Sequence, residues 1–548
     1  MTQRPDDPYI TSVNKRSYNE QQIIEQLTRD VSTWQDKNQN NKTEIAYSFN
    51  NGGFNEVQKQ EARRSLTSWS DVANLEFTES GGPAEGRITF GLSNRVPTAE
   101  GTYPTPNGRG GGETLYNPSM ASRVVMTHEI GHALGLKHPG HYDGSASESQ
   151  RVYAQDSTAH TVMSYFGDRS SGKHLGAKPR APMMDDIAAI QKKYGVNHQT
   201  RKENNTYGFN SNTQRDYYTL NAAQDKFIAC IWDGDGNDTL DVSGYRSNQN
   251  INLKAGSFSD VGGLKGNVSI ARGCTIENAI GGSGHDALIG NEADNRLTGG
   301  GGADQLRGGG GADTFVYNHA SDSAPDQPDT LMDFTSGTDK VDVSRAMKSA
   351  NTSTLAFVSE MTGKAGDTVL VYDEKSGKGS VAIDLTGDGK ADLLIRTHGQ
   401  VKPGDIIASG NSTVLNQPLD TPSTRSTVTP PDRRRRSSTY TYEKASDSPY
   451  HNADLINDFV SGKDTINLAG LVKNAATPLQ LVEHYTGRIG DTVVKLNPQT
   501  GRYFVGVDLT GNRRTDFLVK STQLIKPDDI IGLTTPIKRS ARVFPRPL

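Results

Sequence analysis

The sequence predicts a protein of several domains, in which an N-terminal α/β domain precedes a parallel β-roll and a β-rich module that occurs twice. Three observations lead to this expectation. The 548 residues exceed the length of one ordinary domain. Helix-like and strand-like segments mix before about residue 210, whereas glycine, asparagine and aspartate dominate after it. The later part also contains two internal repeats, one of nine residues and one of a whole module.

Charge and cysteine content limit the classes of function. The 59 Lys and Arg residues nearly balance the 63 Asp and Glu residues, so the net charge of −4 provides no basic field for nucleic acid. Cys230 and Cys274 are too few for a disulfide-dense scaffold, and two buried apolar thiols are favoured over a disulfide. The first thirty residues carry no apolar core of the length that a secretory signal requires, and no apolar run approaches the roughly 20 residues of a membrane span. We expect either a cytoplasmic protein or export by a route that does not read the N-terminus.

The first 210 residues predict two amphipathic helices and several short strands. Residues 17–34 form the first helix, with Ser17 and Glu20 in capping-box spacing, and residues 55–73 form the second. Each helix would bury one apolar face, and the two faces consist of Ile23, Ile24, Leu27, Val31, Val57, Leu66, Trp69 and Val72. Strands are expected at 43–49, 74–79, 87–92 and 113–117. This mixture is typical of an α/β catalytic domain, which would end near the segment MMDDIAAIQKKYG.

Three histidines and a glutamate stand close together in the segment VVMTHEIGHALGLKHPGHYDG. His128 and His132 are four residues apart and would share one face of a helix. Glu129 would reach a metal-bound water rather than the metal. Gly135 can end the helix with a positive φ, so that the chain turns back and brings in His138. Three neutral imidazoles with an open fourth position indicate catalytic zinc.

The alternative for this segment is a set of ordinary histidines on a helix, each satisfied by a neighbour. The spacing HExxH alone does not exclude that alternative, but the longer pattern HExxHxxGxxH rarely arises by chance. Met163, about 25 residues after the third histidine, has the position of a Met-turn methionine that packs beneath the ligands without binding the metal. Tyr165 would place a phenol near the metal, and a buried core tyrosine is its alternative.

A repeat of nine residues begins at glycine 281 and has four turns, GGSGHDALI, GNEADNRLT, GGGGADQLR and GGGGADTFV. Each turn would combine a glycine loop, whose carbonyls point inward, with a short strand of a β-roll. Calcium takes six or more oxygen ligands, which stacked turns supply. The apolar position of the turns holds Leu288, Leu297, Leu306 and Phe315, a register that a flexible glycine linker would not keep. The candidate calcium ligands are Gly282, Gly284, Asp286, Gly299, Gly301, Asp304, Gly308, Gly310 and Asp313, while Asn295 replaces the aspartate of the second turn.

A longer repeat follows, because the segment that begins ASDSAPDQPDT at Ala320 returns as ASDSPYHNADL at Ala445. The linker between the copies is rich in Ser, Thr, Pro and Arg and is expected to be disordered. Its run Arg433–Arg436 is taken as solvated linker in preference to a protease-sensitive or anion-binding site. The expected domains are a short N-terminal segment or propeptide 1–16, the α/β domain 17–210, the β-roll 211–318, the first module 319–408, the linker 409–444, the second module 445–532 and a basic tail 533–548.

These motifs together resemble one known family. The segment from His128 to Gly140, the triplet Met163-Ser164-Tyr165 and MMDDIAAIQKKYG resemble the serralysins, which are secreted bacterial zinc endopeptidases of the metzincin group with a C-terminal calcium-binding repeats-in-toxin β-roll. The segments YGFNSNT, FSDVGGLKGNVSIARGCTIENAIGGSG and ASDSAP are also similar to serralysin. The resemblance covers residues 17–407 and implies a metzincin catalytic domain followed by the roll.

The resemblance assigns a role to each residue of the first motif. His128, His132 and His138 would bind one zinc ion, and Tyr165 would be a mobile fourth ligand that stabilises the tetrahedral intermediate. Glu129 would act as general base and then donate a proton to the leaving amine. Zinc would bring the pKa of its water to about 7 and polarise the scissile carbonyl. The expected reaction is hydrolysis of peptide bonds in extracellular proteins.

The resemblance also implies cofactors, partners and a location. Several structural calcium ions are expected, with one site ahead of the roll formed by Asp233, Asp235, Asp238, Thr275 and Glu277. The partners would be protein and peptide substrates, a type I (ABC) secretion apparatus and a proteinaceous inhibitor, without nucleic acid. We expect an extracellular monomer of a Gram-negative bacterium, with a role in virulence. Two rivals stay open, namely a calcium-dependent adhesion module with a vestigial protease domain and a toxin-like effector with the same chemistry.

Overall fold

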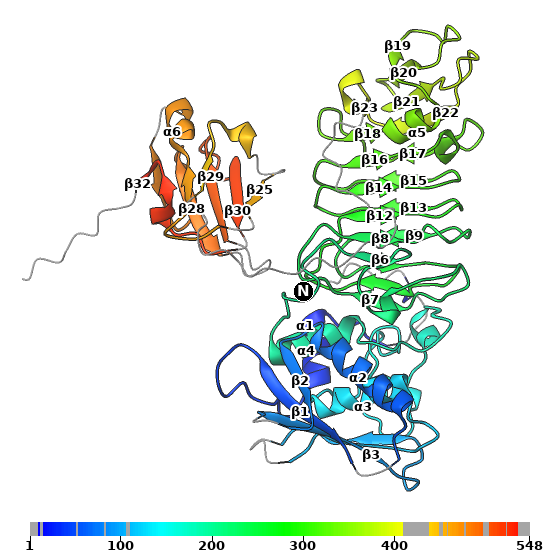
Figure 1. The fold of residues 1–548 in the computed structure, drawn as a ribbon, viewed down its shortest axis with the longest axis vertical. Coiled ribbons are helices and arrows are strands. Elements are labelled where there is room, and N and C mark those ends of the chain that lie inside the picture. The colour runs from blue at the N-terminus through cyan, green and yellow to red at the C-terminus, as the bar shows by residue number, and fades with distance from the viewer. Residues whose placement is uncertain are drawn as a thin grey trace, which may run out of the picture. The chain divides into compact units, whose positions relative to one another are not determined.

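A computed structural model describes residues 9–10, 15–50, 53–81, 84–105, 110–408, 438–448, 453–456, 459–475, 478–496, 503–521 and 523–534. It divides the chain into two compact units, Met1–Thr413 and Val414–Leu548, and each is considered by itself (Figure 1). Most of the expected N-terminal segment 1–16, most of the linker with its run Arg433–Arg436, and nearly all of the basic tail 533–548 lie outside the described residues.

The N-terminal domain contains a sheet with the strand order β2-β1-β3-β5-β4. All strand pairs in it are parallel except the pair of β4 with β5, which is antiparallel and leaves β4 at the edge of the sheet. The four strands expected from the sequence are confirmed to within a residue or so. The bounds are β1 Thr43–Phe49, β2 Leu75–Glu79, β3 Gly86–Leu92, β4 Ala99–Gly101 and β5 Glu113–Tyr116.

Four helices pack with this sheet, and α2 contacts α3 while α1 contacts α4 (Figure 1). Their interior faces are apolar, with Leu27, Trp69 and Ile130 fully buried. The bounds are α1 Glu20–Thr28, α2 Glu56–Ser70, α3 Arg123–Ala133 and α4 Met184–Tyr194.

Three details expected of the helices are wrong. The first helix is capped by Asn19 and Gln22 rather than by Ser17 and Glu20, because the Asn19 side chain accepts the Gln22 N–H and the Gln22 side chain accepts the Asn19 N–H. That helix ends at Thr28, so Val31 lies beyond it. Val57 is 73% exposed because it lies in the first turn of α2, away from the buried face.

Most strands of the repeat region, which we define as residues 206–407, alternate between two sheets (Figure 1). One sheet has the order β23-β18-β16-β14-β12-β8-β6 and is parallel throughout. The other has the order β19-β20-β21-β22-β17-β15-β13-β9, and its strands from β22 to β9 pair in parallel. The bounds are β6 Thr206–Gly208, β8 Thr239–Asp241, β9 Asn250–Asn252, β12 Asn278–Ile280, β13 Ala287–Ile289, β14 Arg296–Thr298, β15 Gln305–Arg307, β16 Thr314–Val316, β17 Thr330–Leu331, β18 Lys340–Asp342, β19 Ala356–Phe357, β20 Asp367–Asp373, β21 Lys378–Ile383, β22 Leu393–His398 and β23 Ile406–Ile407, with helix α5 at Ser344–Ser349.

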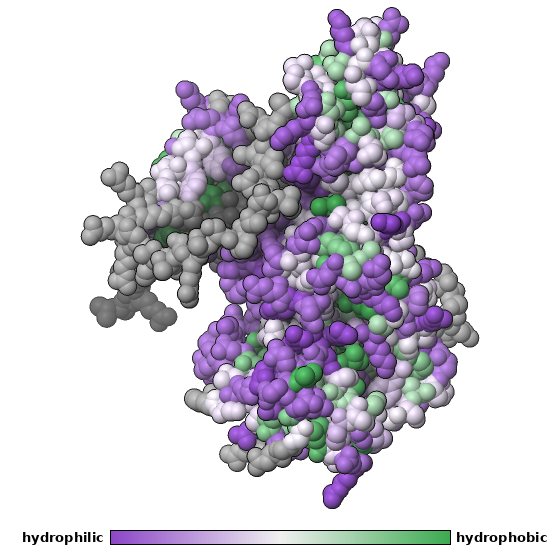
Figure 2. Space-filling model, turned by 45° about the vertical axis from the view of Figure 1, so that its right-hand side comes forward, coloured by the Kyte–Doolittle hydropathy of each residue, from purple (hydrophilic) through white to green (hydrophobic). Residues whose placement is uncertain are grey.

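The apolar position of each nine-residue turn points into the space between these two sheets. Leu288 is in register with Leu306, Leu297 is in register with Phe315, and all four side chains are fully buried. The repeated position therefore builds one continuous core, as the sequence predicts. Hydrophilic residues cover most of the face of this region that Figure 2 presents, and hydrophobic residues appear there only in small groups.

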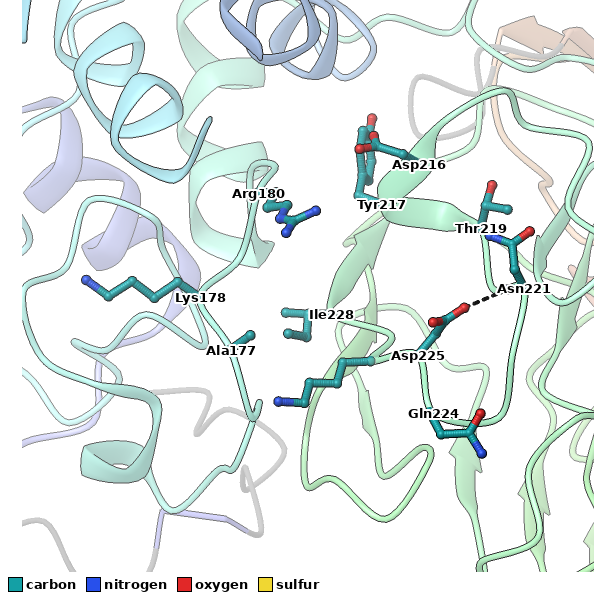
Figure 3. A pocket seen from close by; sticks show the side chains of 11 residues that line it. Ala177, Lys178, Arg180, Asp216, Tyr217, Thr219, Asn221, Gln224, Asp225 and Ile228 are labelled. Atoms are coloured by element: carbon teal, nitrogen blue, oxygen red, sulfur yellow. Dashed lines mark hydrogen bonds between the residues drawn. The ribbon is translucent and has the colours of Figure 1, made fainter. Parts of the chain in front are cut away.

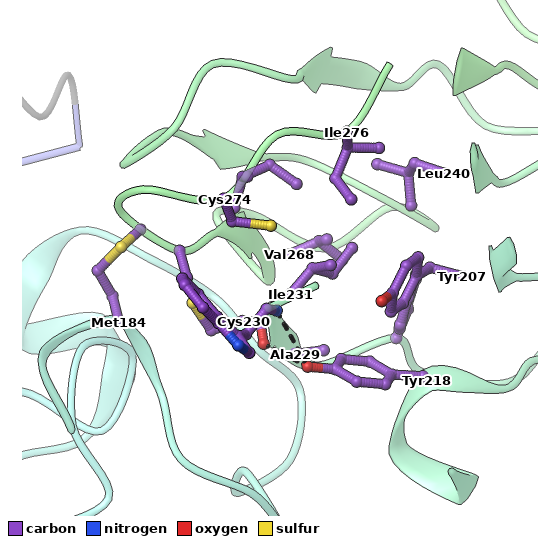
Figure 4. Close-up of a cluster of buried hydrophobic side chains, with 14 of the residues drawn as sticks. Met184, Tyr207, Tyr218, Ala229, Cys230, Ile231, Leu240, Val268, Cys274 and Ile276 are labelled. Carbon is purple, nitrogen blue, oxygen red and sulfur yellow. Dashed lines mark hydrogen bonds between the residues drawn. The ribbon is translucent and has the colours of Figure 1, made fainter. Parts of the chain in front are cut away.

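A smaller sheet with the order β10-β11-β7 joins the repeat region to the N-terminal domain. Around it, Cys230, Cys274 and Tyr218 pack with Met184 of α4 in one buried hydrophobic cluster (Figure 4). Both cysteines are free thiols, which confirms the expectation of two buried apolar side chains instead of a disulfide. The bounds are β7 Ala229–Ile231, β10 Phe258–Ser259 and β11 Val268–Ile270.

The strands do not break at the expected domain boundaries. Strand β6 lies before the boundary placed at 210/211, yet it pairs with β8. Strands β17, β18, β22 and β23 lie beyond the boundary placed at 318/319, yet they extend the same two sheets. One hydrophobic core accordingly runs from Ile23 to Val401 through the whole first unit.

The second unit has its own core, in which Ile466, Val505, Phe517 and Val519 are fully buried. Its strands form two sheets with the orders β24-β26-β31 and β25-β30-β29-β28-β27-β32. The expected linker 409–444 is wrong at its C-terminal end, because Thr439–Thr441 form β24 and pair with β26. The bounds are β24 Thr439–Thr441, β25 Asp454–Ile456, β26 Thr465–Asn467, β27 Leu479–Leu481, β28 Asp491–Leu496, β29 Tyr503–Asp508, β30 Phe517–Ser521, β31 Ile530–Ile531 and β32 Leu533–Thr534, with helix α6 at Ala469–Ala475.

None of the described helices combines the length and apolar character that crossing a membrane requires.

Candidate active site

Helix α3 carries His128, Glu129 and His132, and the turn after it carries His138. The helix ends at Ala133, and Gly135 follows with a φ of +88°, a conformation that a side-chained residue resists. The backbone thereby reverses and places the His138 ring 4.6 Å from the His132 ring and 5.2 Å from the His128 ring, measured between centroids. The structure brings the three predicted ligands together.

Each of the three imidazoles is oriented by a hydrogen bond from its Nδ1 to a backbone carbonyl. His128 Nδ1 lies 2.7 Å from Val162 O, and His132 Nδ1 lies 2.7 Å from Leu136 O. His138 Nδ1 lies 2.9 Å from Tyr142 O. A carbonyl oxygen can only accept, so each Nδ1 carries the proton and each Nε2 keeps its lone pair. Such partners are typical of metal-binding histidines.

The three Nε2 atoms converge on one point. His138 Nε2 lies 3.0 Å from His132 Nε2 and 3.2 Å from His128 Nε2. Tetrahedral coordination at about 2.0–2.1 Å would separate two such nitrogens by roughly 3.4 Å, so the residues fit a zinc ion. Within the described ranges, these histidines are the one group of three potential ligands from His, Cys, Asp and Glu whose ligand atoms lie within 4.8 Å of one another.

Burial keeps the histidines neutral, as metal binding requires. Burial lowers the pKa of His128 to about 3, and it also lowers the pKa of His132 and His138. The alternative of ordinary histidines on a helix would leave three lone pairs facing one another without a partner. Convergence of three unprotonated nitrogens is therefore better explained by a metal.

Glu129 lies beside this centre without joining the three nitrogens. Burial raises the pKa of Glu129 to about 8 in the metal-free site, and the negative charges of Glu100 and Asp143 add to the shift. Strand β4 passes next to the carboxylate, because a Cβ on Gly101 would lie 3.0 Å from Glu129 Oε2. A raised pKa and burial are typical of a group that exchanges protons during catalysis.

Tyr165 and Met163 both lie near the histidines, but only Tyr165 is exposed. Tyr165 is 40% exposed, and its ring centroid lies 4.5 Å from that of His138, which rules out a buried core tyrosine. Met163 is fully buried, and its Sδ would lie 2.5 Å from a Cβ placed on Gly131. Glycine at 131 thus lets the Met163 side chain pack directly against α3, in the position expected of a Met-turn residue.

Asp186 of α4 supports the site, although nothing in the sequence pattern indicates this role. Its buried carboxylate accepts hydrogen bonds from Thr161 Oγ1 at 2.5 Å, from Val162 N at 2.7 Å and from Met183 N at 2.9 Å. Val162 is the residue whose carbonyl orients His128. Asp186 therefore fixes the loop that holds a metal ligand.

Tyr142 has a comparable place behind His138. Its carbonyl accepts the His138 Nδ1 proton, and its hydroxyl donates to Asp156 Oδ1 at 2.9 Å. The Tyr142 ring also lies 5.1 Å from the Tyr165 ring. The sequence signal for this role is weak, because a tyrosine four residues after a ligand has many ordinary explanations.

A cavity of about 630 Å³ lies along the centre. Its lining includes His128, Glu129 and Tyr165, together with Thr98 and Ala99 at the start of the edge strand β4. An unpaired strand edge beside a cleft can bind an extended peptide through backbone hydrogen bonds. Strand β4 is such an edge, and it borders the cleft at Ala99.

The expected calcium site ahead of the repeats is assembled in part. Asp238 N donates to Glu277 Oε2 at 2.8 Å, and Asp233 accepts a hydrogen bond from the Tyr207 hydroxyl. Burial and the negative charge of Asp233 raise the pKa of Asp238 to about 10, which shows how closely these carboxylates crowd. Asp235 is next to this group, because its N–H donates to Asp233 Oδ1 at 2.9 Å, and Thr275 follows Cys274, whose Sγ accepts the Asp233 N–H at 3.3 Å.

The aspartates of the glycine turns form a ladder between neighbouring turns. Asp286 N donates to Asp304 Oδ1 at 2.7 Å, and Asp304 N donates to Asp329 Oδ1 at 2.8 Å. On the other side of the stack, Asn295 N donates to Asp313 Oδ1 at 2.9 Å, and Asp313 N donates to Asp339 Oδ1 at 3.0 Å. Burial raises the pKa of each aspartate in these two rows.

The glycines that open the turns make room for these carboxylates. A Cβ on Gly299 would lie 2.3 Å from Asp304 Oδ2, and a Cβ on Gly308 would lie 1.9 Å from Asp313 Oδ2. Asp304 Oδ2 is buried without a hydrogen-bond partner in the part of the chain that the structure describes. A buried carboxylate oxygen without a partner fits a cation ligand.

Sequence models of two peptidase families match the chain. The family described as Peptidase M10 serralysin C terminal matches residues 196–408 and again residues 405–531. The family described as Metallo-peptidase family M12B Reprolysin-like matches residues 105–192, which contain the three histidines, Glu129 and Tyr165.

Several relatives are similar to this chain over most of their own length. Metallopeptidase AprA of Pseudomonas marginalis is 42% identical over 446 residues, which are 73% of this chain and 93% of the relative. Serralysin C of Dickeya chrysanthemi is 43% identical over 72% of this chain and 90% of its own length. A serralysin of Photorhabdus sp. (strain Az29) is 48% identical over 61% of this chain and 75% of its own length.

Among solved structures, the AlgE6R2 subunit of the mannuronan C5-epimerase of Azotobacter vinelandii covers 32% of this chain at 19% identity, with 94% of its own length aligned. Its TM-score of 0.22 is too low to define a shared fold. The serralysin C-terminal family matches residues of both units, and the relatives above 40% identity are named as metallopeptidases or serralysins. Both findings agree with a metal centre formed by the three histidines. The chain belongs to the serralysin family and is a zinc metalloendopeptidase.

Proposed function

We propose that this endopeptidase is secreted, hydrolyses extracellular proteins with Glu129 as its general base, and is stabilised by calcium. The observation that carries the proposal is the convergence of three unprotonated Nε2 atoms next to a buried carboxylate, on the wall of a cleft that an edge strand borders. A polypeptide lying along β4 would present its scissile carbonyl to that centre.

His128, His132 and His138 would hold the zinc ion. The ion would supply a Lewis acid that polarises the scissile carbonyl. Glu129 takes the proton of the attacking water at a carboxylate oxygen and returns it to the leaving amine. Tyr165 is exposed enough to turn toward the cleft, where its hydroxyl donates to the oxygen that develops negative charge.

Calcium would occupy the glycine turns and the carboxylate group ahead of them. Two features support this part of the proposal, namely the crowding of Asp233, Asp238 and Glu277 and the unpartnered oxygen of Asp304. Asp329 and Asp339 extend the two aspartate rows beyond the nine-residue repeat. We propose that the turn glycines contribute carbonyl oxygens and that the alternating strands form a calcium-binding β-roll.

The two C-terminal modules would be copies of one another. Their turns share the same hydrogen bonds, since Thr362 donates from N and Oγ1 to Asp367 Oδ2 and Thr486 does so to Asp491 Oδ2. In both modules three antiparallel strands follow that turn, β20-β21-β22 in one and β28-β29-β30 in the other. Family membership supports export through a type I (ABC) apparatus and an inhibitor protein as a further partner.

Glu129→Gln tests the proposed base. We expect unchanged zinc content and folding, with hydrolysis of unfolded casein lowered by at least about a hundredfold, because general-base catalysis contributes about 10² to 10⁴. The exposed Glu25 provides a matched control, and Glu25→Gln should hydrolyse casein at the unmodified rate. Activity of the Glu129 variant near that of the control would show that another group takes the proton.

The same preparation separates the enzyme from the adhesion alternative. A chain that binds one zinc ion and still leaves unfolded casein intact would contradict the proposed function. Cleavage that depends on zinc and vanishes in the Glu129 variant would exclude a vestigial protease domain.

A further inference from the structure

A second pocket adjoins the catalytic cleft. It has a volume of about 440 Å³ and lies between residues 177–180 and residues 216–228 of the first unit. Ala177 and Lys178 line both this pocket and the cleft, so the two cavities share one wall. Figure 3 shows Lys178 and Arg180 on one side of the second pocket and Asp216, Asn221 and Asp225 on the facing side.

Four cations border the two cavities, and we call them the basic strip. They are Arg169 and Lys178 in the cleft and Arg180 and Lys226 in the second pocket. Lys226 Nζ donates to Gly176 O at 2.7 Å, which holds it against the shared wall. Lys178 and Arg180 are exposed and make no ion pair with a carboxylate of the described residues.

Apart from the catalytic Glu129, the carboxylates that line these cavities already have partners. Asp216 pairs with the buried Arg123 at 2.6 Å. Asp225 accepts the backbone N–H groups of Asn221 and Ala222 at 2.8 and 2.9 Å. Asp168 accepts the N–H of Leu175 at 2.6 Å. Among the described residues, Lys178 and Arg180 are therefore left without a neutralising carboxylate, whereas Asp216 is paired with Arg123 and the other two aspartates accept backbone N–H groups.

Two acidic side chains lie near the catalytic glutamate, because the charges of Glu100 and Asp143 raise the pKa of Glu129. Glu100 lies on β4 next to the cleft residue Ala99, and Asp143 precedes the cleft residue Gly144. Both acidic side chains are exposed. A bound polypeptide would consequently meet acidic side chains near Glu129 as well as the cations of the basic strip.

We propose that the basic strip is an extended subsite that binds an acidic side chain of the polypeptide substrate, several residues from the scissile bond. This inference rests on the proposed function, because it concerns which proteins the endopeptidase cleaves. The preferred substrates are proteins with Asp or Glu several residues from the scissile bond, on the side of that bond that faces the basic strip. Exposed charge pairs are individually weak, so we expect a preference of about three- to tenfold.

Cleavage-site profiling of a denatured protein by mass spectrometry tests the proposal first. Asp and Glu should be enriched at one fixed position two to five residues from the cleaved bond, on one side only. Two peptides are then made from the most frequent site, with Glu or Gln at that position. Their kcat/KM ratio should favour Glu about three- to tenfold at low salt and should fall toward one at 0.5 M NaCl, because salt screens exposed charges.

Charge reversal provides the decisive comparison. The double variant Lys178→Glu/Arg180→Glu should invert the Glu-to-Gln ratio, and the ratio cancels any general loss of activity. Lys192→Glu makes a similar charge change at an exposed site of α4 outside both pockets and should keep the unmodified ratio. An unmodified enzyme that cleaves both peptides equally, or a double variant with the unmodified ratio, overturns the proposal. Failure of the zinc-loaded enzyme to cleave either peptide would instead contradict the proposed function and remove this inference with it.

Discussion

Replacement of Asp186 by alanine should destabilise the catalytic domain and loosen the zinc site. The carboxylate is fully buried and accepts hydrogen bonds from Thr161 Oγ1 and from the N–H groups of Val162 and Met183. Alanine leaves two buried N–H groups without acceptors, at about 1–3 kcal/mol each. We therefore expect the free energy of unfolding to fall by about 2–6 kcal/mol.

The loss should extend to the metal, because the Val162 carbonyl orients the His128 ring. Loss of such an orienting partner typically lowers metal affinity about 10- to 100-fold. Asp186→Asn is the matched control, since the amide oxygen can accept both N–H groups while its nitrogen donates to the Thr161 hydroxyl. Thermal unfolding and competition for zinc with a chelator measure the two effects. An alanine variant as stable as the asparagine variant, with the same zinc affinity, would refute this reasoning.

Three further predictions concern catalysis and calcium. Tyr165→Phe should keep the zinc content and lower kcat about 10²-fold, as loss of one oxyanion donor does, which stopped-flow assays with a quenched peptide measure. Gly308→Ala should lower the free energy of unfolding by about 1–3 kcal/mol, because the new Cβ would lie 1.9 Å from Asp313 Oδ2. Gly301→Ala is the control, because its Cβ would meet nothing nearer than 3.9 Å. Equal melting temperatures of the two variants would contradict this packing. Burial raises the pKa of Asp313 to about 7, above its unfolded value near 4. The calcium-free protein should therefore lose stability as pH rises from about 4 to 7. Calcium should reduce that loss, which calorimetry at a series of pH values measures.

The zinc centre was predictable because local sequence spacing determines most of it. His128 and His132 share a helix face, and Gly135 allows the reversal that delivers His138. The nine-residue register was predictable for the same reason, since Leu288 and its successors repeat in phase with the strands. These features depend on neighbours that are no further apart along the chain than Leu288 and Leu306.

The features that were missed depend on contacts between distant segments. Asp186 reaches the loop at 161–162 only because α4 packs beneath that loop. Asp339 continues an aspartate row although it lies outside the nine-residue period. Val57 has helical spacing with buried residues, yet its place in the first turn of α2 leaves it exposed. The strand pairing of β6 with β8 likewise could not be recognised from three residues of ordinary strand composition.

Metal analysis combined with X-ray absorption spectroscopy of the purified, calcium-loaded chain tests the central claim most directly. We expect one zinc ion per chain, bound by three imidazole nitrogens at about 2.0–2.1 Å, with the remaining position open to exchangeable solvent. A chain without zinc, or a zinc ion closed by a fourth permanent protein ligand, would contradict it.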